Sequence, residues 1–138
     1  MTVNIIKLCV GVESIDDLQM WQNKRLKENK RVYHVTRMMP RRDAEVLDGG
    51  SLYWVIKGII QVRQKIVEFE PVTGEDGIKR VMMVFDPELV PVRPAPRRAF
   101  QGWRYLNAED APPDLSKSAQ RAGIPVEMRA ELADLGLI

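Results

Sequence analysis

The spacing of apolar residues predicts a strand and then a helix at the start of the chain. Residues 3–12 form a short run rich in β-branched side chains, which favours a strand. Residues 13–30 instead place four apolar side chains within one arc of a helix: Ile15, Leu18, Trp21 and Leu26. Ser14 and Asp17 have the spacing of a capping box, so the helix should begin there and pack its apolar face on a sheet.

A second strand and a short helix are predicted next. Polar and apolar positions alternate over residues 31–39, and Pro40 closes this strand because proline cannot donate to a ladder. Residues 41–50 then predict a helix of about two turns. Its end is expected at Gly49 and Gly50, which can adopt the left-handed conformation.

Residues 52–69 are ambiguous between helix and strand. Their apolar residues recur at spacings of three and four, as in a helix, but the many β-branched residues and Gly58 favour strands. We predict two strands with a break at Lys57 and Gly58. Residues 73–77 then predict a turn, and residues 78–85 a strand that returns as its hairpin partner.

The remaining segments complete the predicted architecture. Residues 86–96 should form an extended edge limited by prolines, residues 102–106 a last strand, and residues 116–122 and 125–135 two short helices. This order predicts a single α+β domain over residues 1–138. Its centre would be a small mixed or antiparallel β-barrel over about residues 1–106, with flanking helices and a helical C-terminal tail over about residues 107–138.

Composition adds a charge gradient to this picture. With 138 residues, 45% of them hydrophobic and 29% charged, the chain has the profile of one globular domain. Residues 31–104 contain 13 lysines and arginines against nine acidic residues, whereas residues 105–138 contain three against six. The basic middle of the chain therefore favours an anionic partner.

Several classes of site and location are excluded or disfavoured. The apolar start is short and interrupted by Lys7, so it makes a poor signal peptide, and no run is long enough for a membrane span. We therefore expect a cytoplasmic protein. Cys9 is the only cysteine and His34 the only histidine, which disfavours a disulfide or a metal site built from several such residues. No nucleotide-binding glycine motif is present, so we expect neither metal nor cofactor.

Motifs along nearly the whole chain resemble a known family. NIIKLCVG, HVTRMMPRR, LDGGSLYWVIKG, DPELV and FQGWRYL, followed by EDAP, occur in this order. Together they resemble small, uncharacterised alphaproteobacterial proteins of the family called domain of unknown function 1489, which implies no activity. Residues 36–58 are also similar to the PUA superfamily, including ASCH and EVE domains, although the G-x-K-x-x-E-x-R signature of ASCH domains is absent. That likeness implies a PUA-like pseudo-barrel that holds RNA or a modified base.

Arginines and aromatic residues indicate a nucleic-acid surface. Residues 93–106 contain four arginines, three aromatic residues and no acidic residue, and three more arginines lie within residues 37–42. Arginine binds phosphate with a planar fork, and exposed rings stack on bases. We therefore predict RNA binding, with phosphates on one rim. The phosphate-binding residues would be Arg37, Arg41, Arg42, Arg97, Arg98 and Arg104. The rings that stack on bases or line a base pocket would be Trp103, Tyr105 and Trp54.

Two other functions fit the sequence. The chain could be a protein-interaction module without catalytic activity, acting as a homodimer or with another protein. It could instead be a small enzyme in which Cys9 and His34 form a nucleophile and base, if their strands are neighbours. An enzyme should have a deep pocket around one of these two residues, whereas an RNA-binding protein should keep its acidic tail away from the arginines.

Overall fold

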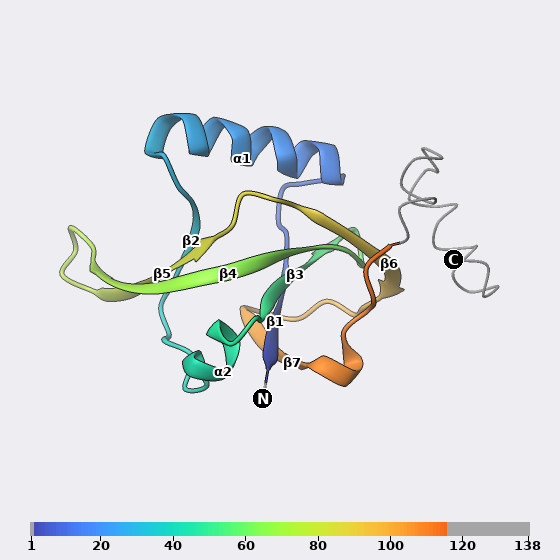
Figure 1. The fold of residues 1–138 in the computed structure, drawn as a ribbon. Helices are drawn as coiled ribbons and strands as arrows, with labels where there is room; N and C mark the ends of the chain where they lie inside the picture. The colour runs from blue at the N-terminus through green and yellow to red at the C-terminus, as the bar shows by residue number, and fades with distance from the viewer. Residues whose placement is uncertain (1, 116–138) are drawn as a thin grey trace.

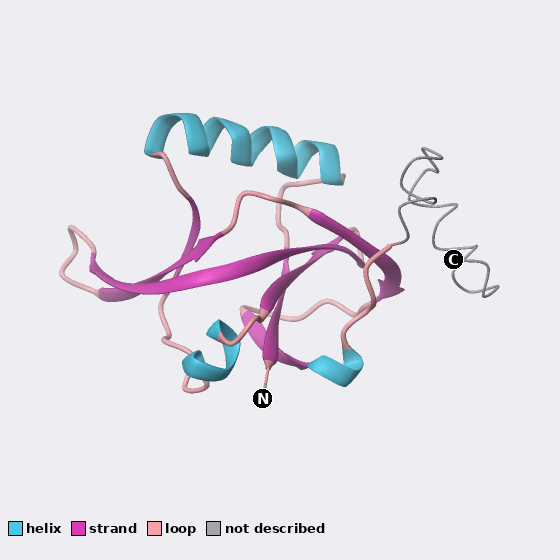
Figure 2. Ribbon diagram, viewed as in Figure 1, coloured by secondary structure: helices cyan, strands magenta, loops and turns pink. Residues whose placement is uncertain are grey.

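A computed structural model describes residues 2–115, which form a mixed sheet of seven strands with two α-helices (Figure 1, Figure 2). The strands are β1 (Val3–Leu8), β2 (Val32–Thr36), β3 (Ser51–Ile56), β4 (Ile59–Thr73), β5 (Lys79–Phe85), β6 (Val90–Pro96) and β7 (Trp103–Asn107). The helices are α1 (Ile15–Asn29), α2 (Asp43–Leu47) and a single 3-10 turn, η1 (Ala108–Asp110). Within this part of the chain, no helix has the length and apolar character to cross a membrane.

The long strand β4 organises the sheet. The strand order is β2-β5-β4-β3-β1-β7, and β6 also pairs with β4. The first half of β4 pairs with β3 and β6, and beyond a bulge between Ile66 and Glu68 the second half pairs with β5. β1 and β3 run parallel, which requires the crossover that α1, β2 and α2 provide.

Two hairpins confirm the strand prediction for the middle of the chain. β3 and β4 are joined at Lys57 and Gly58, whose φ angles of 52° and 75° suit a two-residue turn of type I′. The left-handed backbone at these two residues rules out the continuous helix that the apolar spacing alone suggested. The turn predicted at residues 73–77 also forms, between β4 and β5.

The α+β class is confirmed, but a closed barrel is not. Among the described residues, no pairing joins the end strands β2 and β7, so the sheet stays open. The sheet instead branches at β4, which pairs with β6 over its first half and with β5 over its second half. The two helices predicted within residues 116–135 lie outside the described residues.

The first two strands are shorter than the sequence pattern suggested. β1 ends at Leu8, and Gly11 then takes a φ of 82° in the loop before α1. β2 ends at Thr36, which is also where its pairing with β5 stops, opposite Val81. The loop after β1 leaves the sheet below the start of α1, and this departure opens the pocket described below.

The N-cap predicted for α1 is present at Ser14, and the carboxylate bond of the capping box is displaced by one residue. The Ser14 hydroxyl accepts a hydrogen bond of 3.1 Å from the Asp17 N–H, and the Asp17 carboxylate accepts one of 3.3 Å from the Glu13 N–H. The predicted apolar face is only partly right. Leu18 is buried, but Trp21 is 43% exposed while the polar Gln22 is 2% exposed. A hydrogen-bond network, not apolar packing alone, therefore fixes one side of this helix.

The sheet separates two apolar clusters. The first cluster lies on the face that α1 and α2 cover, and it includes Ile5, Leu18 and Val46. The second lies on the opposite face and includes Ile6 and Leu106. Since neighbouring residues of a strand point to opposite faces, odd-numbered residues of β1 face the helices and even-numbered residues face away.

Candidate functional site

Most of the arginines predicted to hold phosphate are exposed and have no carboxylate partner among the described residues. These are Arg37, Arg41, Arg97, Arg98 and Arg104. Arg42 differs, because its Nε lies 2.5 Å from Glu45 Oε2. The ion pairs of arginines elsewhere are Arg31 with Glu70, Arg63 with Asp114, and Arg80 with Asp76. Within residues 2–115, no carboxylate therefore competes with an external anion for these five arginines.

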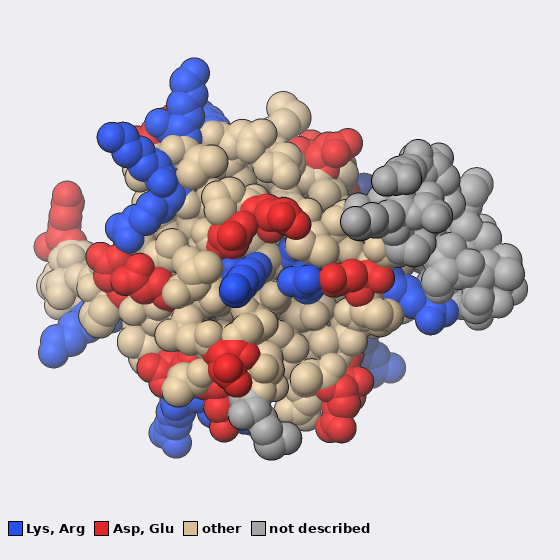
Figure 3. Space-filling view, in the orientation of Figure 1, with Lys and Arg blue, Asp and Glu red and all other residues tan. Residues whose placement is uncertain are grey.

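Strand β7 divides these arginines and aromatic residues between two faces of the sheet. Trp103 and Tyr105 pack against the first cluster, on the helix side. Arg104 lies opposite Ile6 of β1 and shares the second-cluster side with Phe100. Arg104 and the two rings therefore lie on opposite faces of the sheet. The face drawn in Figure 3 likewise mixes basic and acidic side chains.

One group, on the second-cluster side, has a phenyl ring between two arginines. The Arg97 and Arg104 guanidinium carbons lie 6.0 Å and 5.4 Å from the centroid of the Phe100 ring. A guanidinium that rests on a ring keeps its N–H groups available at its edge. Phe100 therefore positions two cations that can donate to the same anionic chain.

The other group, on the helix side, is built around Tyr105. The Arg42 guanidinium lies 5.4 Å from the Tyr105 ring, and the Arg42 backbone N–H donates to the Tyr105 hydroxyl at 3.1 Å. The Trp103 and Tyr105 rings meet edge to face at 5.1 Å. Both rings are partly buried, so they present limited aromatic surface next to the free edge of β7.

A pocket of about 460 Å³ opens under α1, where the loop after β1 leaves the sheet. It is lined by Lys7, Leu8, Cys9, Val10, Gly11, Val12, Leu18, Trp21, Arg25, His34 and Trp54. Trp54 is only 5% exposed, so it cannot act as an open stacking platform. It lies in the wall of the pocket, a position that agrees with the base-pocket alternative for this residue.

Buried hydrogen bonds hold Trp54 in the pocket wall. Its Nε1 donates to Gln64 Oε1 at 3.2 Å, and the Gln64 and Gln22 side-chain amides exchange two hydrogen bonds of 2.7 Å and 2.8 Å. Gln64 Nε2 also donates to the Asp86 carbonyl at 3.0 Å. The network joins α1, β3 and β4, so the shape of the pocket depends on it.

Among the described residues, two cations line the pocket and no acidic residue does. Lys7 lies between Trp54 and Trp103 in the register of the sheet. The Arg25 guanidinium lies 4.4 Å from the Trp21 ring and 5.1 Å from the Tyr33 ring, and it donates to the Tyr33 carbonyl at 3.4 Å. These aromatic and backbone contacts hold the Arg25 charge at the pocket without a carboxylate.

Sequence reasoning did not single out Lys7, Trp21 and Arg25 as site residues, although the sequence carried signals for them. Lys7 occupies a position of β1 whose neighbours on the same face, Val3 and Ile5, are buried, so a charge there is unusual. Trp21 and Arg25 are four residues apart on α1, the spacing at which helical side chains meet.

The pocket that we expected for an enzyme is present around Cys9 and His34, but the two residues lack the properties of a catalytic pair. Burial raises the pKa of Cys9 to about 11, with Lys7 opposing the rise. Burial, Lys7 and Arg25 lower the pKa of His34 to about 4. The thiol therefore stays protonated and the imidazole neutral near pH 7. Their strands are also not neighbours, because β1 pairs with β3 and β7 whereas β2 pairs with β5.

Cys9 should react slowly with disulfide reagents in the folded protein. At about pH 8 we expect it to attack DTNB roughly tenfold more slowly than an unfolded control, because the loss of thiolate outweighs the higher nucleophilicity of a thiol with a raised pKa. The absorbance of released thionitrobenzoate measures this rate with and without urea. Equal DTNB reaction rates with and without urea would show that the fold does not shield the Cys9 thiol.

His34 should make the protein less stable in mild acid. In the unfolded chain the His34 ring takes up a proton below its ordinary pKa of 6.5, whereas in the folded protein it does so only below a pKa of about 4. Protonation therefore favours the unfolded chain, and the stability present above pH 6.5 is lost as the pH falls from 6.5 towards 4. Because the ring is partly exposed, we expect a loss of about 2 kcal/mol. Urea unfolding at several pH values measures it. His34→Gln should flatten this dependence, and an unchanged dependence in that variant would contradict the assignment.

Comparisons with known proteins identify the chain only at the level of a family. A family model described as "Protein of unknown function (DUF1489)" matches residues 5–138. No curated protein matches the chain, and no solved structure matches it. In the described residues, no group of three or more histidine, cysteine or acidic side chains is arranged to hold a metal ion.

Proposed function

The chain belongs to the DUF1489 family, whose function is unknown, and from its geometry we propose that it binds RNA. The observation that carries this proposal is the set of exposed arginines without carboxylate partners in residues 2–115, while Arg31, Arg63 and Arg80 are paired. A nucleic acid carries condensed counterions, and these are released when unpaired guanidiniums bind its phosphates. This release favours binding.

The two faces of β7 suggest how an RNA chain would lie. Among the described strands β7 is an end strand that pairs only with β1, so one RNA chain could cross its other edge and reach both sides. Arg97 and Arg104, which rest on Phe100, would hold phosphates on one side. On the other side, Trp103 and Tyr105 would contact bases, with Arg42 next to Tyr105. The division of the predicted residues between two faces is thereby compatible with one RNA chain.

The proposal includes two finer points. We propose a PUA-like relationship for this open sheet, supported by the short helix and glycines that lead from the arginines at residues 37–42 into the buried strand β3. We also propose a cytoplasmic location, because RNA is the expected partner.

Trp103 offers a test of base stacking that is separate from charge. Trp103→Ala should weaken binding of a single-stranded RNA by about 1 to 2 kcal/mol and leave the salt dependence nearly unchanged, because it removes a ring and no charge. Filter-binding titrations at several salt concentrations measure both quantities. Trp103→Phe, which keeps a ring on the first cluster, is the control. A loss as large for phenylalanine as for alanine, in folded proteins, would exclude stacking at this position.

A further inference from the structure

The pocket under α1 has the features of a site for one nucleotide. We propose that it binds a planar heteroaromatic ring that carries a phosphate, with the ring against the tryptophan walls and the phosphate near Lys7 and Arg25. This site lies on the helix side of the sheet, away from Arg97 and Arg104, so it does not depend on RNA binding by those arginines.

The size and the mouth of the pocket suit such a ligand. Its volume of about 460 Å³ falls in the range of roughly 300 to 1,000 Å³ that holds small organic molecules and cofactors. Two of its lining residues are well exposed apolar side chains, Val10 at 86% and Trp21 at 43%. An aromatic ring can therefore enter from solvent across apolar surface.

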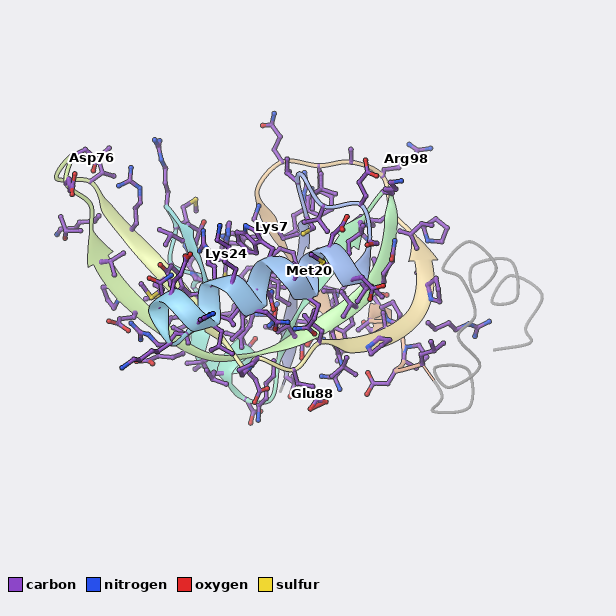
Figure 4. The ribbon with its side chains drawn as sticks, turned by 90° about the horizontal axis from the view of Figure 1, so that it is seen from above. Lys7, Met20, Lys24, Asp76, Glu88 and Arg98 are labelled. Atoms are coloured by element: carbon purple, nitrogen blue, oxygen red, sulfur yellow. The ribbon has the colours of Figure 1, made fainter. Side chains whose placement is uncertain are left out.

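The charge of the pocket favours an anion. Lys7 and Arg25 are both partly buried and have no carboxylate partner among the described residues, so a ligand phosphate would supply the missing counter-charge. Figure 4 shows Lys7 on the opposite side of α1 from the acidic Glu88. Burial is the main cause of the lowered pKa of His34, and both cations lower it further, as a positive potential here would.

The His34 ring, which also lines the pocket, suits a base better than an aliphatic chain. A neutral imidazole offers one donor and one acceptor, and the edge of a nucleobase presents both kinds of group. Trp21 and Trp54 add aromatic surface, and the hydrogen bond that Trp54 Nε1 donates to Gln64 holds Trp54 in place before any ligand arrives. An aliphatic acid would pair with the cations but would leave the His34 hydrogen-bonding groups and the rings unused.

Cys9 allows the site to be tested in the intact chain, because it lines the pocket and is the only cysteine. The rate of DTNB modification would be measured with AMP, UMP, adenosine, uridine, inorganic phosphate, and the hexamers of adenylate and uridylate. We expect AMP or UMP to slow modification at least fivefold at saturation. Nucleosides and phosphate alone should need at least tenfold higher concentrations for the same protection.

The probes also distinguish a free nucleotide from a nucleotide within an RNA chain as the ligand. Protection by a hexamer but not by the monophosphates would support the site and assign it to RNA, and protection by monophosphates alone would assign it to free nucleotides. No protection by either at millimolar concentration, or equal protection by phosphate alone, would overturn the proposal. Fluorescence anisotropy of a labelled hexamer on the same samples separates the two proposals. RNA binding in the absence of Cys9 protection by the hexamers and by the monophosphates would defeat the pocket alone.

Charge variants complete the test. Lys7→Gln should lower affinity for the protecting nucleotide at least tenfold. Lys24→Gln removes the same charge from α1 outside the pocket lining, and it should change affinity less than twofold (Figure 4). Equal losses in both variants would mean nonspecific attraction and would overturn the assignment. Arg25→Gln repeats the test from the helix side if Lys7→Gln fails to fold.

Discussion

Replacing Gln64 with leucine should lower the free energy of unfolding by about 2 to 4 kcal/mol. Gln64 is fully buried, and its amide forms hydrogen bonds with Gln22, Trp54 and the Asp86 carbonyl. Leucine keeps much of the volume but leaves the Gln22 amide, 2% exposed, without a partner inside the core. An unsatisfied buried amide costs more than the hydrogen bond itself contributes, because it has also lost water. Urea unfolding followed by circular dichroism measures the change.

A double variant provides the control for this prediction. Gln22→Leu together with Gln64→Leu removes both amides, so no glutamine remains unpaired in the core. We expect the double variant to be more stable than Gln64→Leu alone, although Trp54 Nε1 loses its partner in both. A double variant whose loss equals the sum of the two single losses would show that the glutamines act independently, contrary to the network described here.

Replacing Arg97, Arg98 and Arg104 with alanine together should weaken RNA binding roughly 100-fold at about 0.1 M salt. Each lost phosphate contact lowers the slope of log affinity against log salt by about 0.7 for a single strand, so the slope should fall by about 2. The loss should be similar for different RNA sequences, because phosphate contacts do not distinguish bases. Filter binding of several RNAs at several salt concentrations measures both effects.

A charge-matched control distinguishes a site from general attraction. Arg31, Lys79 and Arg80 replaced by alanine also remove three positive charges, and Arg31 and Arg80 are already paired with Glu70 and Asp76. Figure 4 places Asp76 at the opposite end of the molecule from Arg98. We expect less than a threefold change in RNA affinity for this control. Equal losses of RNA affinity in the two triple variants would show that net charge, and not this arginine surface, determines binding.

Local features of the fold followed from the sequence because neighbouring residues determine them. The Ser14 cap needs only Asp17, three residues later. The break at Lys57 and Gly58 needs only two residues that tolerate positive φ between strand-forming segments. The end of the helix at residues 43–47 likewise depends on the glycines that follow it.

The site could not be predicted in the same way, because long-range pairing creates it. The pocket exists where β1 pairs in parallel with β3 and α1 crosses above them, which brings Lys7, Arg25 and Trp54 together from three elements. Because side chains alternate between the two faces along a strand, the sequence of β7 could have placed Arg104 on the opposite face from Trp103 and Tyr105. The composition of residues 93–106 instead suggested a single cluster. The predicted barrel is not confirmed, and the pairing of β4 with both β5 and β6 could not be read from the spacing of apolar residues.

The central claim is that the exposed, unpaired arginines bind RNA, and a salt titration of the wild-type chain tests it most directly. Affinity for a single-stranded RNA would be measured by filter binding from about 50 mM salt upward. If the five exposed arginines without a carboxylate partner in residues 2–115 (Arg37, Arg41, Arg97, Arg98 and Arg104) all contact phosphate, log affinity should fall linearly with log salt with a slope of about −3 to −4. A slope near zero, or no RNA retained at about 50 mM salt, would contradict RNA binding by this surface.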